Sequence, residues 1–401
     1  MPTKQAIPRN LRHLRLLPAI ADTRSLTGAA QFHGLSQTAV THALHKLEAA
    51  VGSPLFERSS TGAFPTDRGA VLLARVRRAL DRLDPALESM AAGLSRVVTR
   101  SQLIALIATA DNGNVTLAAR RLGLSQPTVQ RAITDLERAA ARPLFDRAAS
   151  GLVPRRACLT LCRAARLAFA ELDQAEADLA EFDGRIGGRI VVGALPLCRS
   201  NLLPSVLVAF QKERPGIPIS VLDGRYDDLL AGLVSGKIDM ILGALRDPAP
   251  MAEVEQHPLF EDRLCFVAGP DHPMTRGPSP SIDALAQKTW IVPRQEAPSR
   301  HQFESFFQDR GMTPPRNVIE SGSVLLMRET LRQSDMLGCV SGGQAAAEIR
   351  QGLMVKLVVQ PDVPVRPIGL TFRSCWFPTA IQGRFLDLVH DCSSKLQACH
   401  L

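Results

Sequence analysis

The spacing of apolar and polar residues divides the chain into a helical N-terminal part and a C-terminal part in which strands and helices alternate. In the N-terminal part, apolar residues recur every three or four positions, which is the period of an amphipathic helix. From residue 188 onward, short apolar runs alternate with helical stretches. This alternation predicts mostly parallel sheets that are covered by helices on both faces.

The C-terminal part is expected to form two linked α/β lobes, with crossings between them near residues 268 and 364. The expected strands are residues 189–195, 218–222, 239–245, 263–267, 289–292, 317–320, 337–340, 353–359 and 367–372. The expected helices are residues 200–214, 226–235, 301–309, 324–333 and 379–392.

The N-terminal part contains an internal repeat. Residues 26–58 and 115–147 align without a gap at a constant offset of 89 residues. The matches include Gly34-Leu35-Ser36-Gln37 with Gly123-Leu124-Ser125-Gln126, and Pro54-Leu55-Phe56 with Pro143-Leu144-Phe145. So many identities at one offset indicate a duplicated module.

Each copy of the module has the pattern of a helix-turn-helix. A short helix with an alanine pair comes first, at residues 27–33 and 116–122. Gly34 and Gly123 suit the left-handed backbone that ends a helix, and Ser36 and Ser125 suit the N-cap of the next helix. An apolar stripe follows in each second helix, formed by Val40, Leu44 and Leu47 in copy one and by Val129, Ile133 and Leu136 in copy two.

The polar face of each second helix predicts contact with DNA, because Gln pairs with adenine, Arg with guanine, and Thr touches the thymine methyl group. A Pro-Leu-Phe-x-Arg segment then predicts a short β-wing whose arginine reaches backbone phosphates. The predicted DNA-binding residues are Ser36, Gln37, Thr38, Thr41, His42 and Arg58 in copy one, and Ser125, Gln126, Thr128, Gln130, Arg131 and Arg147 in copy two. For either helix taken singly, an ordinary solvated face is the alternative. We expect copy two to dominate base recognition, since Arg131 stands where copy one has His42.

The net charge of +8 is unevenly distributed along the 401 residues. Residues 1–170 contain 24 basic and 11 acidic side chains, and nearly all of the basic ones are Arg, whereas the remainder has a net charge of −5. A basic N-terminal part followed by a mildly acidic remainder indicates that only the N-terminal part contacts phosphates.

The duplicated motif resembles the DNA-binding domain of LysR-type regulators, over roughly forty residues in each copy. Copy one keeps the family's wing ending, Pro65-Thr66-Asp67-Arg68-Gly69, whereas copy two departs from it with Pro154-Arg155-Arg156-Ala157-Cys158. Typical members have one such domain, so the duplication is itself a departure and leaves open which copy reads DNA. The resemblance implies a linker helix after each wing, at residues 67–90 and 156–182, and in the family such a helix pairs with its twin in a dimer.

The C-terminal part resembles the effector domain of the same family along its whole length. The matching residues are Leu202-Leu203-Pro204, Phe210, Pro215, Gly236-Lys237-Ile238-Asp239 and His272-Pro273-Met274. The resemblance implies a fold like that of a periplasmic binding protein, with a ligand in the cleft between the lobes. The implied effector-binding residues are Leu197, Cys198, Ser200, Asp223, Gly224, Leu245, Pro293, Arg294, Gln295, Ser321 and Ser323. Ser200 is expected at a helix N-terminus, where it would bind an anion or a hydroxyl; for each residue, a plain helix cap or turn is the alternative.

Two further segments, residues 193–197 and 373–376, are similar to a LysR branch that includes regulators of sugar and aromatic-acid catabolism. This similarity implies that the effector is a sugar or an organic acid.

The predicted fold is α+β overall: two N-terminal winged helix-turn-helix modules with linker helices, followed by a two-lobed α/β effector domain. The expected boundaries are 10–98 for the first module with its helix, 99–155 for the second module, 156–187 for the linker helix and hinge, and 188–401 for the effector domain. Within the effector domain, lobe I is expected to comprise 188–268 and 365–401, and lobe II 269–364.

The function expected from these features is a ligand-responsive, sequence-specific DNA-binding transcription regulator. Its expected partners are double-stranded DNA, the effector, a second copy or three further copies of the chain, and RNA polymerase. One alternative is a small-molecule-binding co-regulator whose N-terminal modules contact proteins. The other is an α/β enzyme, which the absence of GxSxG, GxGxxG and P-loop motifs disfavours.

No cofactor, metal or membrane partner is expected, and the expected location is the cytoplasm, because the sequence has neither a long apolar run nor a signal-peptide pattern. The eight cysteines, at 158, 162, 198, 265, 339, 375, 392 and 399, form no CxxC pair and are interpreted as small buried hydrophobic residues. Cys158 and Cys162 are one helical turn apart, which leaves redox sensing as an alternative for that pair.

Overall fold

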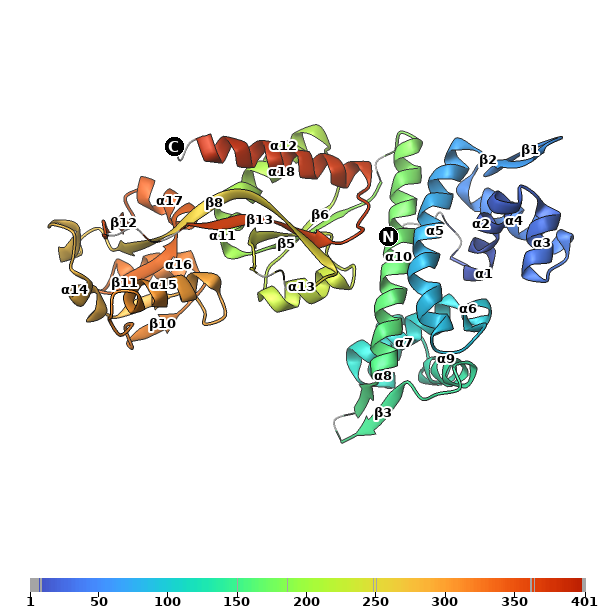
Figure 1. Cartoon of the computed structure of the whole chain (residues 1–401), viewed down its shortest axis with the longest axis horizontal. Helices are drawn as coiled ribbons and strands as arrows, with labels where there is room; N and C mark the ends of the chain where they lie inside the picture. Colours follow the sequence, from blue (N-terminus) through green and yellow to red (C-terminus); the bar gives the residue numbers. More distant parts are fainter. Residues whose placement is uncertain are drawn as a thin grey trace. The chain divides into compact units, whose positions relative to one another are not determined.

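The computed structural model describes residues 7, 9–149, 151–185, 187–247, 249, 251–360, 363 and 365–398. The chain forms two compact units, Met1–Arg189 and Ile190–Leu401 (Figure 1). The boundary between the units follows the glycine-containing segment 184–188.

The first unit contains the two copies of the repeated module, with their elements in the same order. Copy one consists of α1 (Leu11–Leu14), α2 (Leu16–Thr23), α3 (Leu26–His33), α4 (Gln37–Val51), β1 (Phe56–Ser59), β2 (Gly62–Pro65) and α5 (Asp67–Glu88). Copy two consists of α7 (Arg100–Asn112), which is equivalent to α1 and α2 together, followed by α8 (Val115–Leu122), α9 (Gln126–Ala139), β3 (Phe145–Ala148), β4 (Gly151–Pro154) and α10 (Arg156–Phe182); the short helix α6 (Leu94–Val97) connects the copies. The predicted helix-turn-helix, wing and linker helix are therefore present in both copies, and the equivalent elements begin 89 residues apart.

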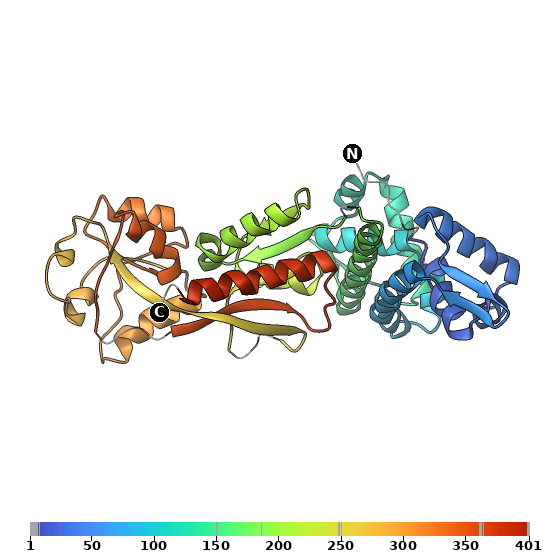
Figure 2. The same ribbon diagram turned by 90° about the horizontal axis from the view of Figure 1, so that it is seen from above.

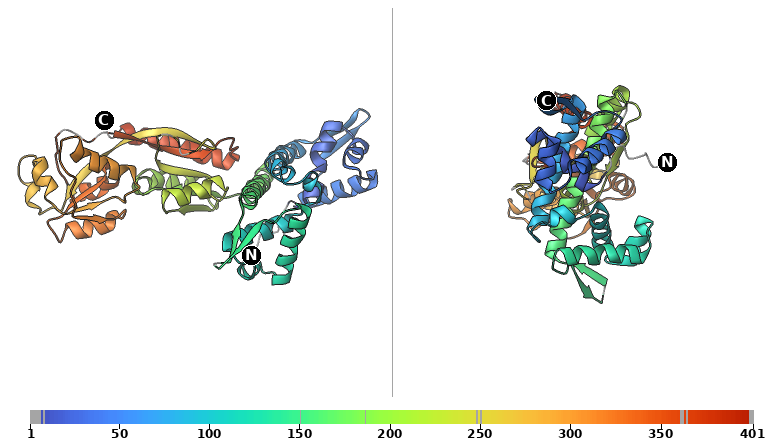
Figure 3. Two further views of the ribbon diagram at one scale, coloured as in Figure 1. Left: turned by 60° about the horizontal axis from the view of Figure 1, so that its bottom comes forward. Right: turned by 90° about the vertical axis from the view of Figure 1, so that its right-hand side faces the viewer.

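One hydrophobic core runs through both copies. Its centre is the pair of long helices α5 and α10, which lie side by side and antiparallel (Figures 1 and 3). Arg68, near the start of α5, pairs with Asp183 just beyond the end of α10, and Arg82, near the other end of α5, pairs with Glu171 in the middle of α10. The partner of each linker helix in this structure is thus the linker helix of the other copy.

The second unit is built on one nine-stranded sheet that serves two lobes. Its strands are β5 (Ile190–Ala194), β6 (Ile219–Leu222), β7 (Met240–Ala244), β8 (Val254–Ala268), β9 (Trp290–Val292), β10 (Val318–Glu320), β11 (Leu337–Ser341), β12 (Val355–Lys356) and β13 (Val365–Arg373). Its helices are α11 (Pro196–Ser200), α12 (Leu202–Glu213), α13 (Tyr226–Val234), α14 (Ile282–Ala286), α15 (Pro298–Gln308), α16 (Val324–Leu331), α17 (Gly342–Arg350) and α18 (Ala380–Ala398), with a 3-10 turn at Pro273–Thr275.

The long strand β8 connects the lobes. It pairs with β13 over residues 254–263 in the first lobe and with β11 over residues 264–268 in the second lobe. The prediction of a mostly parallel sheet is only half right: β5–β6, β5–β7, β9–β10 and β9–β11 are parallel, whereas β7–β13, β8–β13, β8–β11 and β8–β12 are antiparallel. The antiparallel pairs arise because β8 and β13 carry the chain between the lobes in opposite directions.

Helices cover both faces of the sheet in the first lobe, as predicted. Helices α12 and α18 pack together against one face and share a core with β5, β7 and β13 (Figure 2). Helix α13 covers the other face through Leu229, Leu230 and Leu233. The carboxyl ends of β5 and β7 consequently open toward the second lobe.

Candidate nucleic-acid interface and ligand cavity

The turns between α3 and α4 and between α8 and α9 adopt the predicted backbone. Gly34 and Gly123 have φ angles of 63° and 66°, in the left-handed region that glycine tolerates. The Ser36 hydroxyl accepts a hydrogen bond from the Ala39 amide at 3.2 Å and caps α4. Ser125 occupies the N-cap position of α9 as predicted, but its hydroxyl is bonded to the Thr128 hydroxyl at 2.8 Å and forms no capping bond to a backbone amide.

The second helix of each module buries its apolar stripe and exposes its polar face. Val40 and Leu47 in α4, and Val129 and Leu136 in α9, are fully buried. All of the predicted DNA-binding residues on the two helices and wings are exposed apart from Thr41, which is half-buried. The structure therefore leaves both polar faces open to a duplex.

A glutamate braces each wing against its helix-turn-helix. The Glu48 carboxylate accepts the Leu55 amide at 2.9 Å, and the Glu137 carboxylate accepts the Leu144 amide at 2.7 Å. These bonds fix the start of each wing, and hence its arginine, relative to the second helix. Leu47-Glu48 and Leu136-Glu137 are identical at the repeat offset. This identity is the sequence signal that points to the two glutamates, although it does not reveal the bond.

The junction between wing and linker helix differs between the copies. In copy one, the Thr66 hydroxyl accepts the Gly69 amide and donates to the Pro54 carbonyl, both at 3.0 Å. In copy two, Arg155 occupies this position and pairs with Asp146 at 2.5 Å, so α10 begins without a side-chain cap. The hairpin β3–β4 forms nevertheless, so the departure from the family's wing ending changes the cap and leaves the wing in place.

A cavity of about 830 Å³ lies between the two lobes of the second unit. It is bordered by the ends of β5 and β7, the start of α13, the loops after β9 and β10, and residues of β11 and β13. A cavity of this volume is in the range of small-molecule sites.

Seven of the predicted effector-binding residues line this cavity: Leu197, Asp223, Gly224, Pro293, Arg294, Ser321 and Ser323. Among the described residues, Cys198, Ser200, Leu245 and Gln295 are not part of its lining. Cys198 is buried in the core of the first lobe. The expected helix 200–214 is divided at Asn201 into α11 and α12, and Ser200 is the last residue of α11. The prediction that Ser200 lies at a helix N-terminus is therefore wrong.

The two serines also form local hydrogen bonds. The Ser323 hydroxyl accepts the Leu326 amide at 3.2 Å and caps α16, and the Ser321 hydroxyl accepts the Ser323 amide at 3.1 Å. Ser323 therefore combines a place in the cavity wall with a helix cap, and Ser321 combines such a place with a turn, the two alternatives considered for these residues.

The lining residues that the sequence did not identify include Tyr226, Arg246 and Arg366. The Arg246 guanidinium lies over the Tyr226 ring, 4.3 Å from its centroid. Burial lowers the pKa of Arg246 and raises the pKa of Tyr226. Within the described part of the chain, Arg246 has no carboxylate within ion-pair distance, although the charge of Asp227, which also lines the cavity, acts on its guanidinium.

Buried polar atoms gather around the same cavity. The Nε atom of Arg366, the hydroxyl of Ser341 and the hydroxyl of Tyr226 are buried and lack hydrogen-bond partners among the described residues. An unsatisfied buried polar group costs about 1–3 kcal/mol. A polar ligand that reaches these groups after small side-chain shifts would recover part of that cost.

Ion pairs border the cavity on both lobes. Arg225 of the first lobe pairs with Glu296 of the second lobe at 3.0 Å, and Arg199 pairs with Asp223 at 2.9 Å. All four side chains are at least one-third exposed, so each pair contributes little stability and can open at small cost.

Five of the described cysteines are buried, namely Cys158, Cys162, Cys198, Cys265 and Cys339, whereas Cys375 is exposed and Cys392 is partly exposed, so the interpretation as buried residues is wrong for Cys375. Cys158 and Cys162 are 0% and 1% exposed, with their Sγ atoms 4.0 Å apart. The contact with Cys162 and burial raise the pKa of the Cys158 thiol, which disfavours the reactive thiolate that redox sensing requires. Burial also raises the pKa of Cys198 and Cys265 to about 12. Cys399 lies outside the described residues.

Two family models match the chain. The model described as LysR substrate binding domain matches residues 183–391. The model described as bacterial regulatory helix-turn-helix protein, lysR family, matches twice, at residues 11–70 and 101–159. No described helix has both the length and the apolar character needed to span a membrane.

Similar proteins include transcriptional regulators and solved structures of such regulators. HTH-type transcriptional regulator GalR of Pseudomonas putida is 33% identical over 368 residues, covering 91% of this chain and 92% of that protein. HTH-type transcriptional regulator PcaQ of Agrobacterium fabrum is 27% identical, covering 72% of this chain and 93% of that protein. The crystal structure of CbnR, a LysR family transcriptional regulator, matches with a TM-score of 0.52 and 20% identity, covering 73% of this chain and 99% of that chain.

Proposed function

The chain belongs to the LysR family of transcriptional regulators, and on that premise we propose that it responds to a small organic acid bound between the lobes of its second unit. It is a DNA-binding transcription regulator with a substrate-binding domain. The organic acid, the individual contact residues and the oligomeric state are the proposed parts. The role proposed for the second unit is binding rather than catalysis.

The observation that carries the choice of an acid is a pair of shielded arginines in the cavity wall, whose lining also includes acidic side chains. Arg246 has no carboxylate within ion-pair distance among the described residues, and Arg366 is only 11% exposed and pairs with Asp262 at 3.5 Å. A carboxylate satisfies an arginine fork with two charge-assisted hydrogen bonds, which a neutral sugar does not offer. The Tyr226 ring and the apolar side chains of Leu195 and Val324 would pack against the remainder of such a ligand.

On the DNA side, we propose that the exposed faces of α4 and α9 read bases and that Arg58 and Arg147 hold phosphates. The support is the exposure of these residues and the bracing of each wing by Glu48 or Glu137. Ligand binding that closes or opens the lobes would shift the chain between two arrangements with different DNA affinity. Association into homodimers or homotetramers and contact with RNA polymerase complete the proposal.

The test is a thermal-shift comparison of acids with their uncharged analogues. Benzoate, phenylacetate, succinate and gluconate would each be compared with benzamide, phenylacetamide, succinamide and glucose. A ligand that binds only the folded state raises the melting temperature in proportion to its occupancy. At least one acid should stabilise the chain while its uncharged partner does not, and Arg246→Gln should abolish that shift.

Arg276→Gln is the matched control, because the Arg276 side chain is 73% exposed and does not line the cavity. It should leave the acid-induced shift unchanged. Stabilisation by glucose or the amides with no response to the acids would contradict the proposal, as would an unchanged shift in Arg246→Gln.

A further inference from the structure

The pairing of α5 with α10 joins the two DNA-reading modules within one chain. The helices are antiparallel, so the modules at their N-terminal ends lie at opposite ends of the helix pair (Figures 1 and 3). The charge pairs place residue 67 of α5 and residue 156 of α10 about 28 residues apart along the common axis, which is about 40 Å at the rise of an α-helix. This is the scale of one turn of DNA, about 34–36 Å, which separates half-sites read by paired modules.

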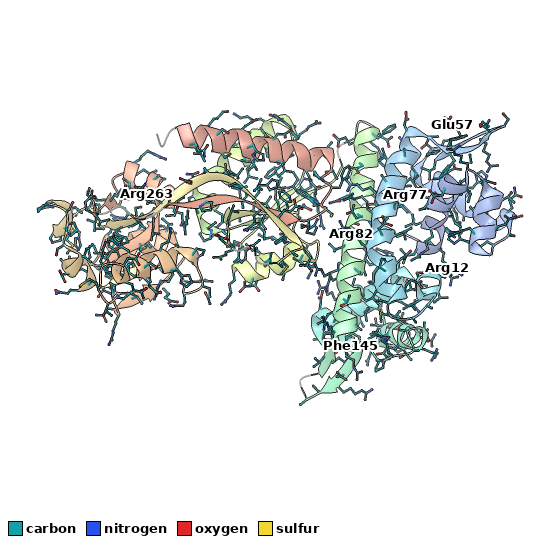
Figure 4. The ribbon with its side chains drawn as sticks, in the orientation of Figure 1. Arg12, Glu57, Arg77, Arg82, Phe145 and Arg263 are labelled. Carbon is teal, nitrogen blue, oxygen red and sulfur yellow. The ribbon has the colours of Figure 1, made fainter. Side chains whose placement is uncertain are left out.

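The helix pair is stabilised by a buried charge cluster. Arg75 is 1% exposed, and its guanidinium donates to Asp178 at 2.7 Å, Gln174 at 2.8 Å and Glu171 at 3.1 Å. Glu171 is itself 4% exposed and lies 3.3 Å from Arg82 of α5, which is labelled in Figure 4. The arginines come from α5 and their polar partners from α10, so the two helices are complementary and not equivalent.

The repeat offset shows why each helix prefers the other copy over itself. The position in α5 equivalent to Glu171 is Arg82, and those equivalent to Gln174 and Asp178 are Pro85 and Ser89. Two α5 helices paired in the same register would set Arg75 against Arg82 and remove all three of its partners. In α10 the position equivalent to Arg75 is Ala164, so two α10 helices would leave Glu171 buried without a cation.

An additional contact fastens the start of copy one to the linker helix of copy two. Arg9 lies 2.5 Å from Asp173 and 3.2 Å from Glu176, both in α10. At the equivalent positions, Val98 in place of Arg9 and Leu87 in place of Glu176 are buried apolar residues of the common core. The exchange of an ion pair for an apolar contact at matching positions again distinguishes the copies.

We propose that one chain carries two unlike DNA-binding heads, its two helix-turn-helix modules, and occupies both halves of a two-part DNA site whose halves differ in sequence. The proposal rests on DNA reading by α4 and α9, as proposed above. The reading faces differ: Thr38, Thr41 and His42 in α4 stand where α9 has Pro127, Gln130 and Arg131. The helix pair fixes the spacing and order of the two half-sites, and neither a second chain nor a symmetric operator is required.

The first part of the test selects duplexes from a random library with the full-length chain. The expected motif has two dissimilar halves at one spacing. Two matched variants then assign the halves: Gln37→Ala with Thr41→Ala in α4, and Gln126→Ala with Gln130→Ala at the equivalent positions of α9. Each should erase one half of the motif, a different one for each variant, and weaken binding to the complete site at least about tenfold.

The second part asks whether both heads must belong to one chain. The two variants are co-expressed with different tags, co-purified, and titrated with the complete site. Because each chain supplies only one working head, the mixture should bind no more tightly than the better single variant. Circular dichroism and a melting temperature equal to that of the wild type would show that the substitutions, one of them at the half-buried Thr41, leave the fold intact.

Three results would overturn the proposal: a symmetric motif, loss of the same half in both variants, or recovery of wild-type affinity in the mixture. A wild-type chain that selects no motif at all would overturn DNA reading itself and the proposal with it. The outcomes of selection thus separate a failure of the paired-head proposal from a failure of the proposed function.

Discussion

Replacing Arg75 with alanine should loosen the helix pair on which both heads are mounted. The substitution removes three hydrogen bonds, to Asp178, Gln174 and Glu171, at a position that is 1% exposed. Breaking a buried ion pair costs about 3–5 kcal/mol, since the remaining charge stays buried without its partner. Glu171 keeps Arg82 at 3.3 Å and Arg78 at 3.6 Å, so we expect the lower end of this range, about 3 kcal/mol.

Hydrogen exchange of the full-length chain measures this loss at the helices themselves. When exchange is limited by the opening equilibrium, 1.4 kcal/mol corresponds to a tenfold change, so amides of α5 and α10 should exchange about 100-fold faster in Arg75→Ala. Amides of the second unit should be unaffected. This local readout is preferable to a global unfolding curve, because two units need not unfold in one transition.

The control is Arg77→Ala on the same helix. The Arg77 side chain is 44% exposed and pairs with Asp22, which is 60% exposed (Figure 4). An exposed pair contributes about 0–1 kcal/mol, so exchange should change by less than about fivefold. Equal exchange rates in Arg75→Ala and Arg77→Ala would show that the buried charge cluster does not stabilise the pairing of α5 with α10.

Three further predictions follow from the charge of the head, its reading faces and the buried thiols. DNA affinity should fall steeply between 50 and 200 mM salt, because residues 1–170, with 24 basic side chains, release counterions from the DNA phosphates on binding. An affinity insensitive to salt would contradict this prediction. Arg131→Ala should relax preference at one base position at a cost of about 1–3 kcal/mol, while His42→Ala should weaken binding modestly with the preference kept, and selection on both variants would expose a reversal of these roles. Iodoacetamide at pH 8 should label the exposed Cys375 and spare Cys198 and Cys265, because their pKa values of about 12 keep these two thiols protonated until the pH approaches 12. Mass spectrometry measures the labelling of each thiol, and rapid labelling of Cys198 or Cys265 in the native chain would show that burial does not protect it.

The local features of the DNA-binding modules could be predicted from the sequence because they depend on short-range chemistry. Gly34 and Gly123 end their helices in the left-handed conformation, and the wings and linker helices begin 89 residues apart in the two copies. The pairing of α5 with α10 could not be predicted in the same way. It depends on which arginines of one copy meet which carboxylates of the other, and that register emerges only when both copies share a core.

The residues that line the cavity could likewise be predicted only in part. Residues that directly follow strands or precede helices, such as Asp223 and Pro293, were found because strand ends meet at one edge of the sheet. Arg246 was not predicted although it follows Leu245 directly, because the apolar run that predicts the strand ends at Leu245. Arg366 was missed because it reaches the cavity from β13, a strand that returns to the first lobe after the whole of the second lobe.

One titration shows whether an anion in the lobe cavity controls DNA binding, as proposed above. The full-length chain would be titrated with its selected DNA site, with and without the carboxylate that stabilises it in the thermal-shift comparison, in the wild type and in Arg246→Gln. We predict that the carboxylate changes the dissociation constant or the footprint of the wild type and leaves those of Arg246→Gln unchanged. Identical binding curves and footprints for the wild type with and without the carboxylate would contradict the account.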